Sequence, residues 1–195
     1  KGSWQVLKYK KIKANKVQFS PEGMKIKVNA SASPVIYPLS QPMIVASLQV
    51  KGVLNGGVKI PKGKDQGEKA TDDYVLRVGL VIEGQQRLNF FQRKIAPKWV
   101  TTLFALAPKG KGVDYIYFLN AAQSKKHLNR ERKHPLSDLM LEKNQWVLKA
   151  SDPTHSFDLS AELKKPMKVL AVWISVDGDD TNSKFELDLE SLRLR

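Results

Sequence analysis

The chain has 195 residues, 42% of them hydrophobic, and a formal net charge of +14. This length and composition fit one folded domain over residues 1–195 and disfavour wholesale disorder, because enough apolar surface is present to build a core. The absence of cysteine excludes disulfides, thiolate metal sites and cysteine nucleophiles. The longest apolar run, Val169 to Val176, has the length of a buried strand and falls far short of the roughly 20 residues of a membrane-spanning helix.

The surplus of positive charge predicts attraction to polyanions such as nucleic acid, anionic lipid headgroups or acidic polysaccharide. The alternative is that the charge only keeps the protein soluble. Lysine outnumbers arginine and is the poorer residue for geometric recognition of phosphate. No nucleic-acid-binding motif is recognised, so we expect no specific nucleic-acid partner.

Apolar and polar residues alternate along most of the chain, and this pattern predicts strands. A turn at Pro21–Gly23 predicts a hairpin between Lys16–Phe19 and Gly23–Asn29, the second strand having a lysine-lined solvent face. The other expected strands are Trp4–Tyr9, Met43–Val50, Tyr74–Ile82, Trp99–Leu106, Val113–Leu119, Trp146–Ala150, Val169–Val176 and a last strand that reaches Leu189, with a bulge near Ser191.

Helical signals are sparse. Asn55–Gly67 is rich in Gly, Lys and Asp and is expected to be a loop, and Asp158–Lys164 is expected to form one or two helical turns. Many short strands separated by turn residues are typical of a sandwich or barrel. We therefore predict an all-β fold, a two-sheet antiparallel β-sandwich of the jelly-roll kind with at most one or two short helices.

Four short motifs occur in a characteristic order: a strand opened by Trp4, the segment Ala30–Ser33, the pair Asp72-Asp73 before a strand with Arg77, and the run Val172–Asn182 before the last strand. In order and spacing the chain resembles the DUF3047 family of bacterial envelope proteins. It departs from the family pattern at Asp180, where members usually have Asn, and at residues 163–166, which lack an aromatic-Gly pair.

This resemblance implies a jelly roll similar to galactose-binding-like and carbohydrate-binding modules, with no established reaction. It also implies export, so we expect a periplasmic or secreted protein. The chain begins at Lys1 without an apolar signal region, as expected of a mature or trimmed chain whose export signal is not visible.

The acidic loop with Asp177, Asp179 and Asp180 is the sharpest local feature. Closely spaced carboxylates are the ligands that Ca²⁺ prefers, so these three residues are candidate ligands of a structural Ca²⁺. The alternative is a hairpin turn in which Asp and Asn bond their own backbone. We expect no other cofactor, since the loop lacks the spacing of an EF-hand and three scattered histidines do not make a zinc site.

A second group of candidate residues combines positive charge with tyrosine. Arg77 shares a strand face with Asp73 and is expected to form either a buried strut between sheets or part of a polar ligand site. Arg130, Arg132 and His134 lie in a basic segment that would bind an acidic ligand, the alternative being a solvated basic strand. Tyr115 and Tyr117 share a face and would supply the proton-transfer group of a polysaccharide lyase.

The expected function is a non-catalytic binding module of the bacterial envelope that recognises carbohydrate, with anionic carbohydrate among the candidates. Trp99, Trp146 and Trp173 sit in apolar segments and are expected in the core. No Walker loop, GxSxG or HExxH motif is present, and no catalytic residue is assigned. The alternatives are a lyase-like enzyme acting on acidic polysaccharide, and a charge-driven polyanion binder or protein-interaction module.

Overall fold

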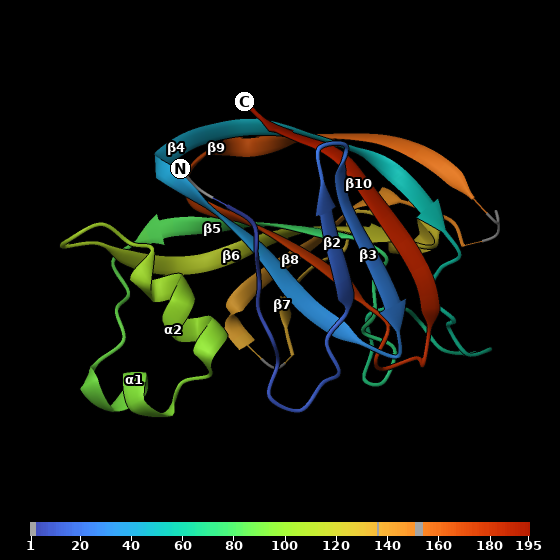
Figure 1. Ribbon diagram of the computed structural model, residues 1–195, viewed down its shortest axis with the longest axis horizontal. Coiled ribbons are helices and arrows are strands. Elements are labelled where there is room, and N and C mark those ends of the chain that lie inside the picture. Colours follow the sequence, from blue (N-terminus) through green and yellow to red (C-terminus); the bar gives the residue numbers. More distant parts are fainter. Residues whose placement is uncertain (1–2, 136, 151–153) are drawn as a thin grey trace.

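The fold was obtained as a computed structural model that describes residues 3–135, 137–150 and 154–195. Strands make up most of it (Figure 1). The strands are β1 (Gln5–Val6), β2 (Lys16–Ser20), β3 (Gly23–Asn29), β4 (Ala32–Asn55), β5 (Arg77–Gly84), β6 (Gly112–Ala122), β7 (Glu131–His134), β8 (Ser137–Val147), β9 (His155–Asp177) and β10 (Lys184–Leu194). Two short α-helices, α1 (Phe90–Ile95) and α2 (Lys98–Ala105), and one 3₁₀ turn, η1 (Lys125–His127), complete it. Within the described ranges no helix has the length and apolar character needed to cross a bilayer.

The described strands join in one hydrogen-bonded sheet in the order β2-β3-β10-β4-β9-β5-β6-β8-β7, with β1 added beside β4. All pairs in it are antiparallel except β6 with β8, which run parallel. The expected β-rich fold with two short helices is confirmed. The expected jelly roll of two separate antiparallel sheets is not confirmed. Strands β4 and β9 pair with each other and connect β10 on one side to β5 on the other, so the strands form a single mixed sheet.

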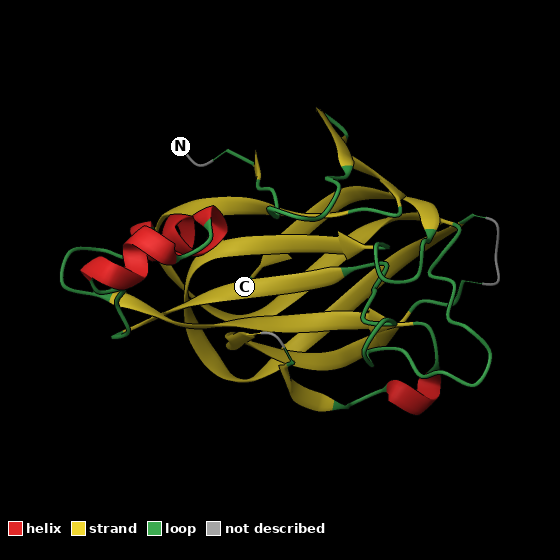
Figure 2. Ribbon diagram, turned by 90° about the horizontal axis from the view of Figure 1, so that it is seen from below, coloured by secondary structure: helices red, strands yellow, loops and turns green. Residues whose placement is uncertain are grey.

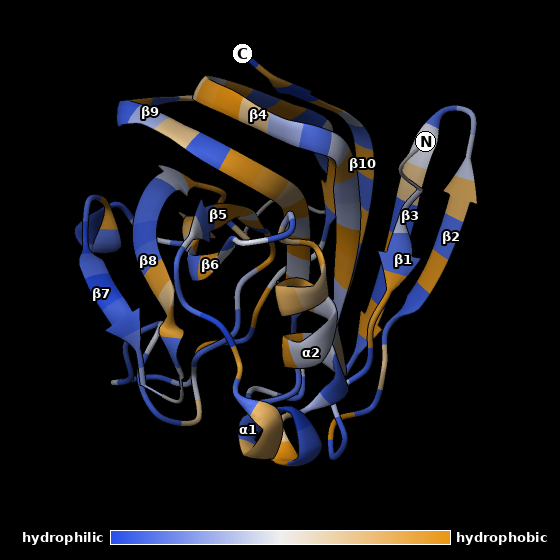
Figure 3. Cartoon of the chain, turned by 90° about the vertical axis from the view of Figure 1, so that its left-hand side faces the viewer, coloured by the Kyte–Doolittle hydropathy of each residue, from blue (hydrophilic) through white to orange (hydrophobic). Residues whose placement is uncertain are grey.

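Strands β4 and β9 are long and bend sharply midway. Pro38 and Pro42 lie at the bend of β4, where the pairing with β9 shifts register between Pro38 and Met43 and again between Val45 and Ser47. Proline cannot donate a ladder hydrogen bond, so it interrupts the pairing and allows the sheet to turn. The two strands therefore curve over the rest of the molecule (Figures 1 and 3).

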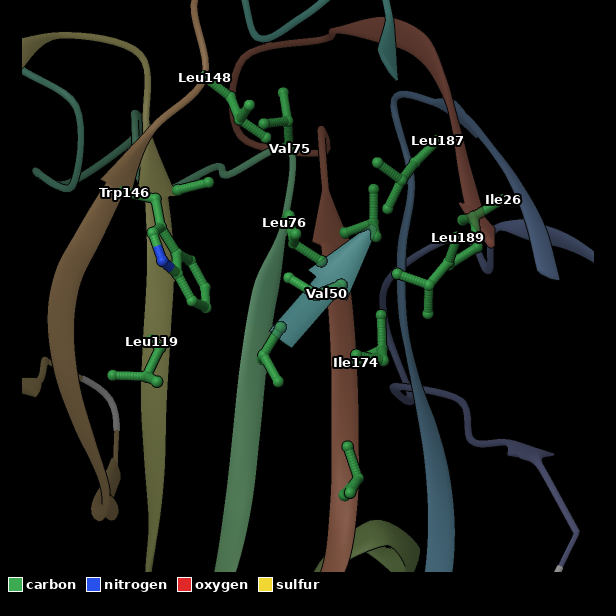
Figure 4. Close-up of a cluster of buried hydrophobic side chains, with 14 of the residues drawn as sticks. Ile26, Val50, Val75, Leu76, Leu119, Trp146, Leu148, Ile174, Leu187 and Leu189 are labelled. Carbon is green, nitrogen blue, oxygen red and sulfur yellow. The ribbon is translucent and has the colours of Figure 1, made fainter. Parts of the chain in front are cut away.

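The bend brings two parts of the sheet face to face. The β10 layer consists of β2, β3 and β10 with the second half of β4 and the first half of β9. The β5 layer consists of β5–β8 with the other halves of β4 and β9. Their inner faces share one buried cluster, in which Leu187 and Ile26 of the β10 layer oppose Trp146 and Leu76 of the β5 side (Figure 4). The Trp146 indole also donates to Ser160 O at 2.8 Å.

Both faces of the β5 layer are covered: the inner face by the β10 layer and part of the outer face by helix α2. Its outer face carries a second apolar cluster, in which Val81, Phe118 and Trp173 pack with Leu103 of helix α2. Gly79 is required there, because a Cβ at that position would lie 2.7 Å from the Phe118 ring. A strand buried on both faces reads as a nearly continuous apolar run, and β5 is of this kind.

Local sequence signals gave mixed results. The hairpin of β2 with β3 and the bulge before Ser191 are confirmed. The expected strand Trp99–Leu106 is wrong, because this segment forms helix α2 after Pro97, with Val100 and Leu103 on its buried side. The expected helical turns at Asp158–Lys164 are also wrong, since these residues belong to β9 and pair with β4. In both cases contacts with distant strands outweigh weak local preferences.

Candidate ligand-binding cleft

A cleft of about 1010 Å³ opens on the outer face of the β5 layer. Its apolar lining includes Ile12, Trp99, Phe118 and Met140, which lie on four different segments. Six acidic and four basic residues also line it, which gives the cleft a formal charge of −2 with its histidine neutral. The acidic residues are Glu68, Asp72, Asp73, Asp177, Asp179 and Asp180, and the basic ones are Lys69, Arg77, Arg130 and Arg132. The cleft is thus acidic in a chain of net charge +14.

One edge of the cleft is formed by the segment 7–15, which crosses the start of β4 and contributes Tyr9 and Ile12 to the lining. Backbone hydrogen bonds fix it at both ends, from Leu7 N to Pro34 O and from Ala32 N to Lys13 O. The buried Asn15 side chain donates to Val176 O at 2.7 Å and accepts from Ser31 Oγ at 2.7 Å. Burial, together with the negative charge of Asp177, raises the pKa of Tyr9 well above its usual range.

Arg77, at the start of β5, is the centre of a buried charge cluster. Only 5% of the residue is exposed. Its Nε donates to Asp177 Oδ2 at 2.9 Å, one terminal nitrogen to Glu142, and the other to both the backbone oxygen and the carboxylate of Asp72. With its donors directed at protein acceptors, Arg77 is a strut rather than a group presented to a ligand, as one of the two sequence interpretations held.

Arg132 extends this cluster towards the cleft mouth. It donates from Nε to Glu142 Oε2 at 2.6 Å and from its terminal nitrogens to the Asp72 carboxylate and Gly67 O. Gly67 adopts a φ of +86°, and a Cβ there would lie 2.8 Å from the Tyr74 hydroxyl, so glycine is needed for this contact. His134 Nε2 lies 3.2 Å from Asp72 Oδ2. Three carboxylates thus surround two guanidinium groups.

The loop after β9 is tied to the segment before β5. The Asp73 carboxylate accepts from Thr181 N at 2.7 Å and from Thr181 Oγ1 at 2.6 Å, and Asp180 Oδ2 accepts from Asp72 N at 3.2 Å. These reciprocal contacts hold two loops that are more than 100 residues apart in sequence. The alternative to a metal site was a turn whose Asp and Asn bond their own backbone, but the Asp180 carboxylate instead accepts from the backbone of the segment before β5.

Three of the acids that line the cleft have pKa values shifted in opposite directions. Burial raises the pKa of Asp72, but the hydrogen bond with His134 and the charges of Arg77 and Arg132 outweigh it and place that pKa well below its usual range. Burial raises the pKa of Asp177 to about 7 in spite of Arg77, which already faces two other carboxylates. Burial and the negative charge of Asp73 raise the pKa of Asp179 to about 6. The pKa of Asp179 therefore lies closer to neutral pH than that of an ordinary carboxyl group.

The expected calcium ligands do not converge. Asp177 is engaged by Arg77 and by Ser175 Oγ at 2.7 Å, and Asp180 is turned towards Asp72 N. Across the described part of the chain, no group of three or more His, Cys, Asp or Glu side chains is arranged to hold a metal ion. Alternate spacing along a loop placed the carboxylates near one another, but their hydrogen bonds direct them to different partners.

The structure divides the expected ligand-binding residues into two sets. Arg77, Arg130, Arg132 and His134 all line the cleft. Tyr115 and Tyr117 do not, because successive strand residues face opposite sides and both tyrosines pack against the inner core while Phe118 faces the cleft. The sequence correctly placed the two tyrosines on a common face, but that face points away from the site.

Sequence reasoning missed two contributors. Glu142 on β8 is 2% exposed and binds both arginines, yet its partner Arg77 is 65 residues away in sequence. Alternation with the buried Met140 was the available signal. Trp99, expected in the core, is only partly buried and lines the cleft from helix α2, where it contacts Trp173 with ring centroids 5.7 Å apart. Trp146 and Trp173 are buried as expected.

Comparison with known proteins adds no assignment. No protein-family model matches the chain, and no curated protein matches it. The resemblance to DUF3047 therefore stays a prediction.

Proposed function

We propose that this chain is a carbohydrate-binding module whose ligand lies in the cleft between helix α2, the 7–15 segment and the acidic loop. The observation that carries the proposal is the combination of an aromatic floor with a polar, largely carboxylate rim in one cleft. A concave site of several hundred Å³ with apolar walls and a few fixed polar groups is the usual form of a small-ligand site.

The aromatic floor suits a sugar ring. Trp99 is partly exposed, and its contact with the buried Trp173 restrains the ring. Phe118 and Met140 line the same cleft from the neighbouring strands β6 and β8 and are themselves largely buried. Large aromatic side chains supply much of the contact energy in such sites at a low cost in side-chain entropy.

The charge of the cleft narrows the ligand class. Carboxylates accept hydrogen bonds from sugar hydroxyls or amines, and Asp179 faces the cleft while Asp73 is occupied by Thr181. A formal charge of −2 repels uronate or sulfate groups, so the site favours neutral or amino-bearing glycans over acidic ones. The +14 charge of the whole chain then reflects other surfaces.

We propose further that the bent single sheet is a variant of the jelly-roll plan of carbohydrate-binding modules, which the two facing layers support. We also propose that the protein acts in the periplasm or outside the cell, which the resemblance to DUF3047 supports.

The proposal is tested by glycan-array binding and calorimetry with neutral, amino and acidic oligosaccharides at about 50 mM and about 300 mM salt. We expect a neutral or amino glycan to bind, with Trp99→Ala lowering the affinity about tenfold or more. Tyr117→Ala is the matched control, because this aromatic side chain packs on the opposite face and should leave affinity unchanged.

Asp179→Asn is a second test that does not depend on the fold tolerating the loss of Trp99. It keeps the shape of the side chain while removing its negative charge, and should weaken an amino glycan more than a neutral one. Absence of binding on all three panels, or binding that neither substitution alters, would overturn the proposal.

A second candidate function is glycoside hydrolysis. Its specific support is that Asp179, with a pKa raised to about 6, has the property of a general acid, whereas Asp72 is held ionised nearby in the lining. Release of reducing ends from a bound glycan, abolished by Asp179→Asn, would establish this activity. The lyase hypothesis built on Tyr115 and Tyr117 has no support from the cleft.

A further inference from the structure

Helix α1 carries the three most exposed of the large apolar side chains in the described part of the chain. Phe90, Phe91 and Ile95 are 66%, 76% and 83% exposed, and the helix has no buried residue. It projects beside α2 at one end of the molecule, away from the sheet (Figures 1 and 2). Exposed apolar groups of this size that contribute nothing to the core are typical of interaction sites.

Local interactions form this helix without help from packing. Asn89 Oδ1 accepts from Gln92 N at 2.8 Å, and Gln92 Oε1 accepts from Asn89 N at 2.9 Å, which is a complete capping box. Helix α2, anchored through Val100 and Leu103, begins at Lys98 and holds the C-terminal end of α1 in place. The sequence thus specifies an ordered element that presents its apolar side chains to solvent.

All charged side chains in the segment that contains these apolar residues are positive. Between residues 84 and 113 the sequence has six basic residues and no acidic one. Lys94 Nζ lies 4.5 Å from the centre of the Phe90 ring, and Arg93 is one residue earlier in the same turn. The acids that border the segment are engaged, since Glu83 pairs with Lys168 at 2.8 Å and Asp114 accepts from Gln85 N at 2.9 Å.

We propose that helix α1 docks this protein on an anionic lipid bilayer, with Phe90, Phe91 and Ile95 inserted at the interface and the flanking lysines and arginines on lipid phosphates. The helix supplies the apolar contact that an interfacial helix needs, and the cations supply attraction to anionic headgroups. Residues 91 and 95 are four apart and therefore lie on one side of the helix, next to the cations of the same turn. This role is independent of the cleft.

The test is cosedimentation of the whole chain with vesicles of phosphatidylcholine that contain about one-third phosphatidylglycerol, and with pure phosphatidylcholine vesicles. We expect binding to the anionic vesicles that is at least about tenfold stronger than to the neutral ones. The double substitution Phe90→Ser and Phe91→Ser should lower binding about tenfold or more, because it removes two inserted rings. Arg93→Gln with Lys94→Gln should lower it about fivefold or more.

Two controls match these variants in chemistry but not in position. Ile44→Ser removes an apolar side chain that is 60% exposed on β4, and Lys62→Gln with Lys64→Gln removes two exposed cations from a loop. Neither control should change vesicle binding by more than about twofold.

Three outcomes would overturn the proposal. The first is absence of binding to anionic vesicles at about 50 mM salt. The second is wild-type binding by the Phe90→Ser, Phe91→Ser variant, which would show that net charge alone draws the protein to lipid. The third is concentration-dependent self-association, removed by the same variant, in a protein that does not bind vesicles, which would make α1 a contact between copies of this chain.

Discussion

The two ends of strand β5 differ in what they bury: charged side chains are buried at its start, and apolar side chains are exposed beyond its end. At its start, Arg77 brings charge into the protein and satisfies it with Asp72, Glu142 and Asp177. Beyond its end, helix α1 brings Phe90 and Phe91 out of the protein and leaves them in solvent. The first arrangement is costly to remove because its members depend on one another, whereas the second costs the fold almost nothing to remove.

This difference separates structural from interactive residues. Buried charges hold one wall of the cleft in place, and Trp99 and Asp179, the residues proposed to contact a ligand, line the same cleft. The exposed apolar residues of α1 have no such structural role, which agrees with the lipid contact proposed for them. Unfolding and amide-exchange measurements distinguish the two kinds of residue.

Arg77→Met should cause the greatest loss, about 3–5 kcal/mol in the free energy of unfolding, because it leaves buried carboxylates without their counter-charge. Urea unfolding at neutral pH measures it. Arg193→Met, at an exposed position on β10, is the matched control and should change stability by less than about 0.5 kcal/mol. Equal effects of the two substitutions would contradict the assignment of Arg77 as a strut.

Asp177→Asn should change how stability depends on pH. Because the pKa of Asp177 is raised in the folded state to about 7, its contribution is fully present below about pH 4 and is lost as pH rises to about 7. The asparagine variant lacks this loss, so its free energy of unfolding should rise relative to that of the wild type across that window by about 4 kcal/mol. Thermal unfolding at several pH values tests it. A difference that stays constant from pH 4 to 7 would show that the carboxyl is already ionised throughout.

Asn89→Ala should affect only the α1 end. Loss of the capping box destabilises the helix by about 1 kcal/mol, which speeds amide exchange at Arg93 and Ala96 about fivefold. Both of these amides donate within the helix, to Asn89 O and Gln92 O. Amides in the middle of β5 serve as the internal reference and should exchange at an unchanged rate.

Phe91→Ser should have the smallest effect on stability, within about 0.5 kcal/mol of the wild type, because the side chain is already 76% exposed. Urea unfolding measures this value as well. A loss of more than about 2 kcal/mol would mean that Phe91 packs on the protein in solution, and would remove the contrast between the two ends of β5.

Sequence patterns predicted the fold where local and distant interactions agree. The alternating residues of β3 are buried on one side and exposed on the other, so period two was visible there. Helix α2 was misread as a strand because its apolar residues suit either structure and the deciding contact, Leu103 on the outer face of the β5 layer, lies outside the segment. The single bent sheet depends on pairing between β4 and β9, which no local pattern contains.

The candidate site was predicted in part for the same reason. Arg77, Arg132 and His134 are unusual residues in strand-like segments and could be selected individually. Their shared partners could not, because Glu142 and Asp177 reach Arg77 only after the sheet is assembled. The side of the sheet on which Tyr115 and Tyr117 lie was likewise undetermined until helix α2 showed which face holds the cleft.

The pairing of β4 with β9 also determines the order in which the protein can be built. Leu54 pairs with His155, so about 100 further residues must be synthesised after this end of β4 before its partner strand β9 begins. Such distant pairing is slow, since the entropy of closing a long loop is lost before the contacts repay it. Arg77 meets Asp177 only when the end of β9 arrives, so the cleft is among the last features to form during synthesis. Until then β4 is an unprotected strand, and the nascent chain is most exposed to mispairing in that interval.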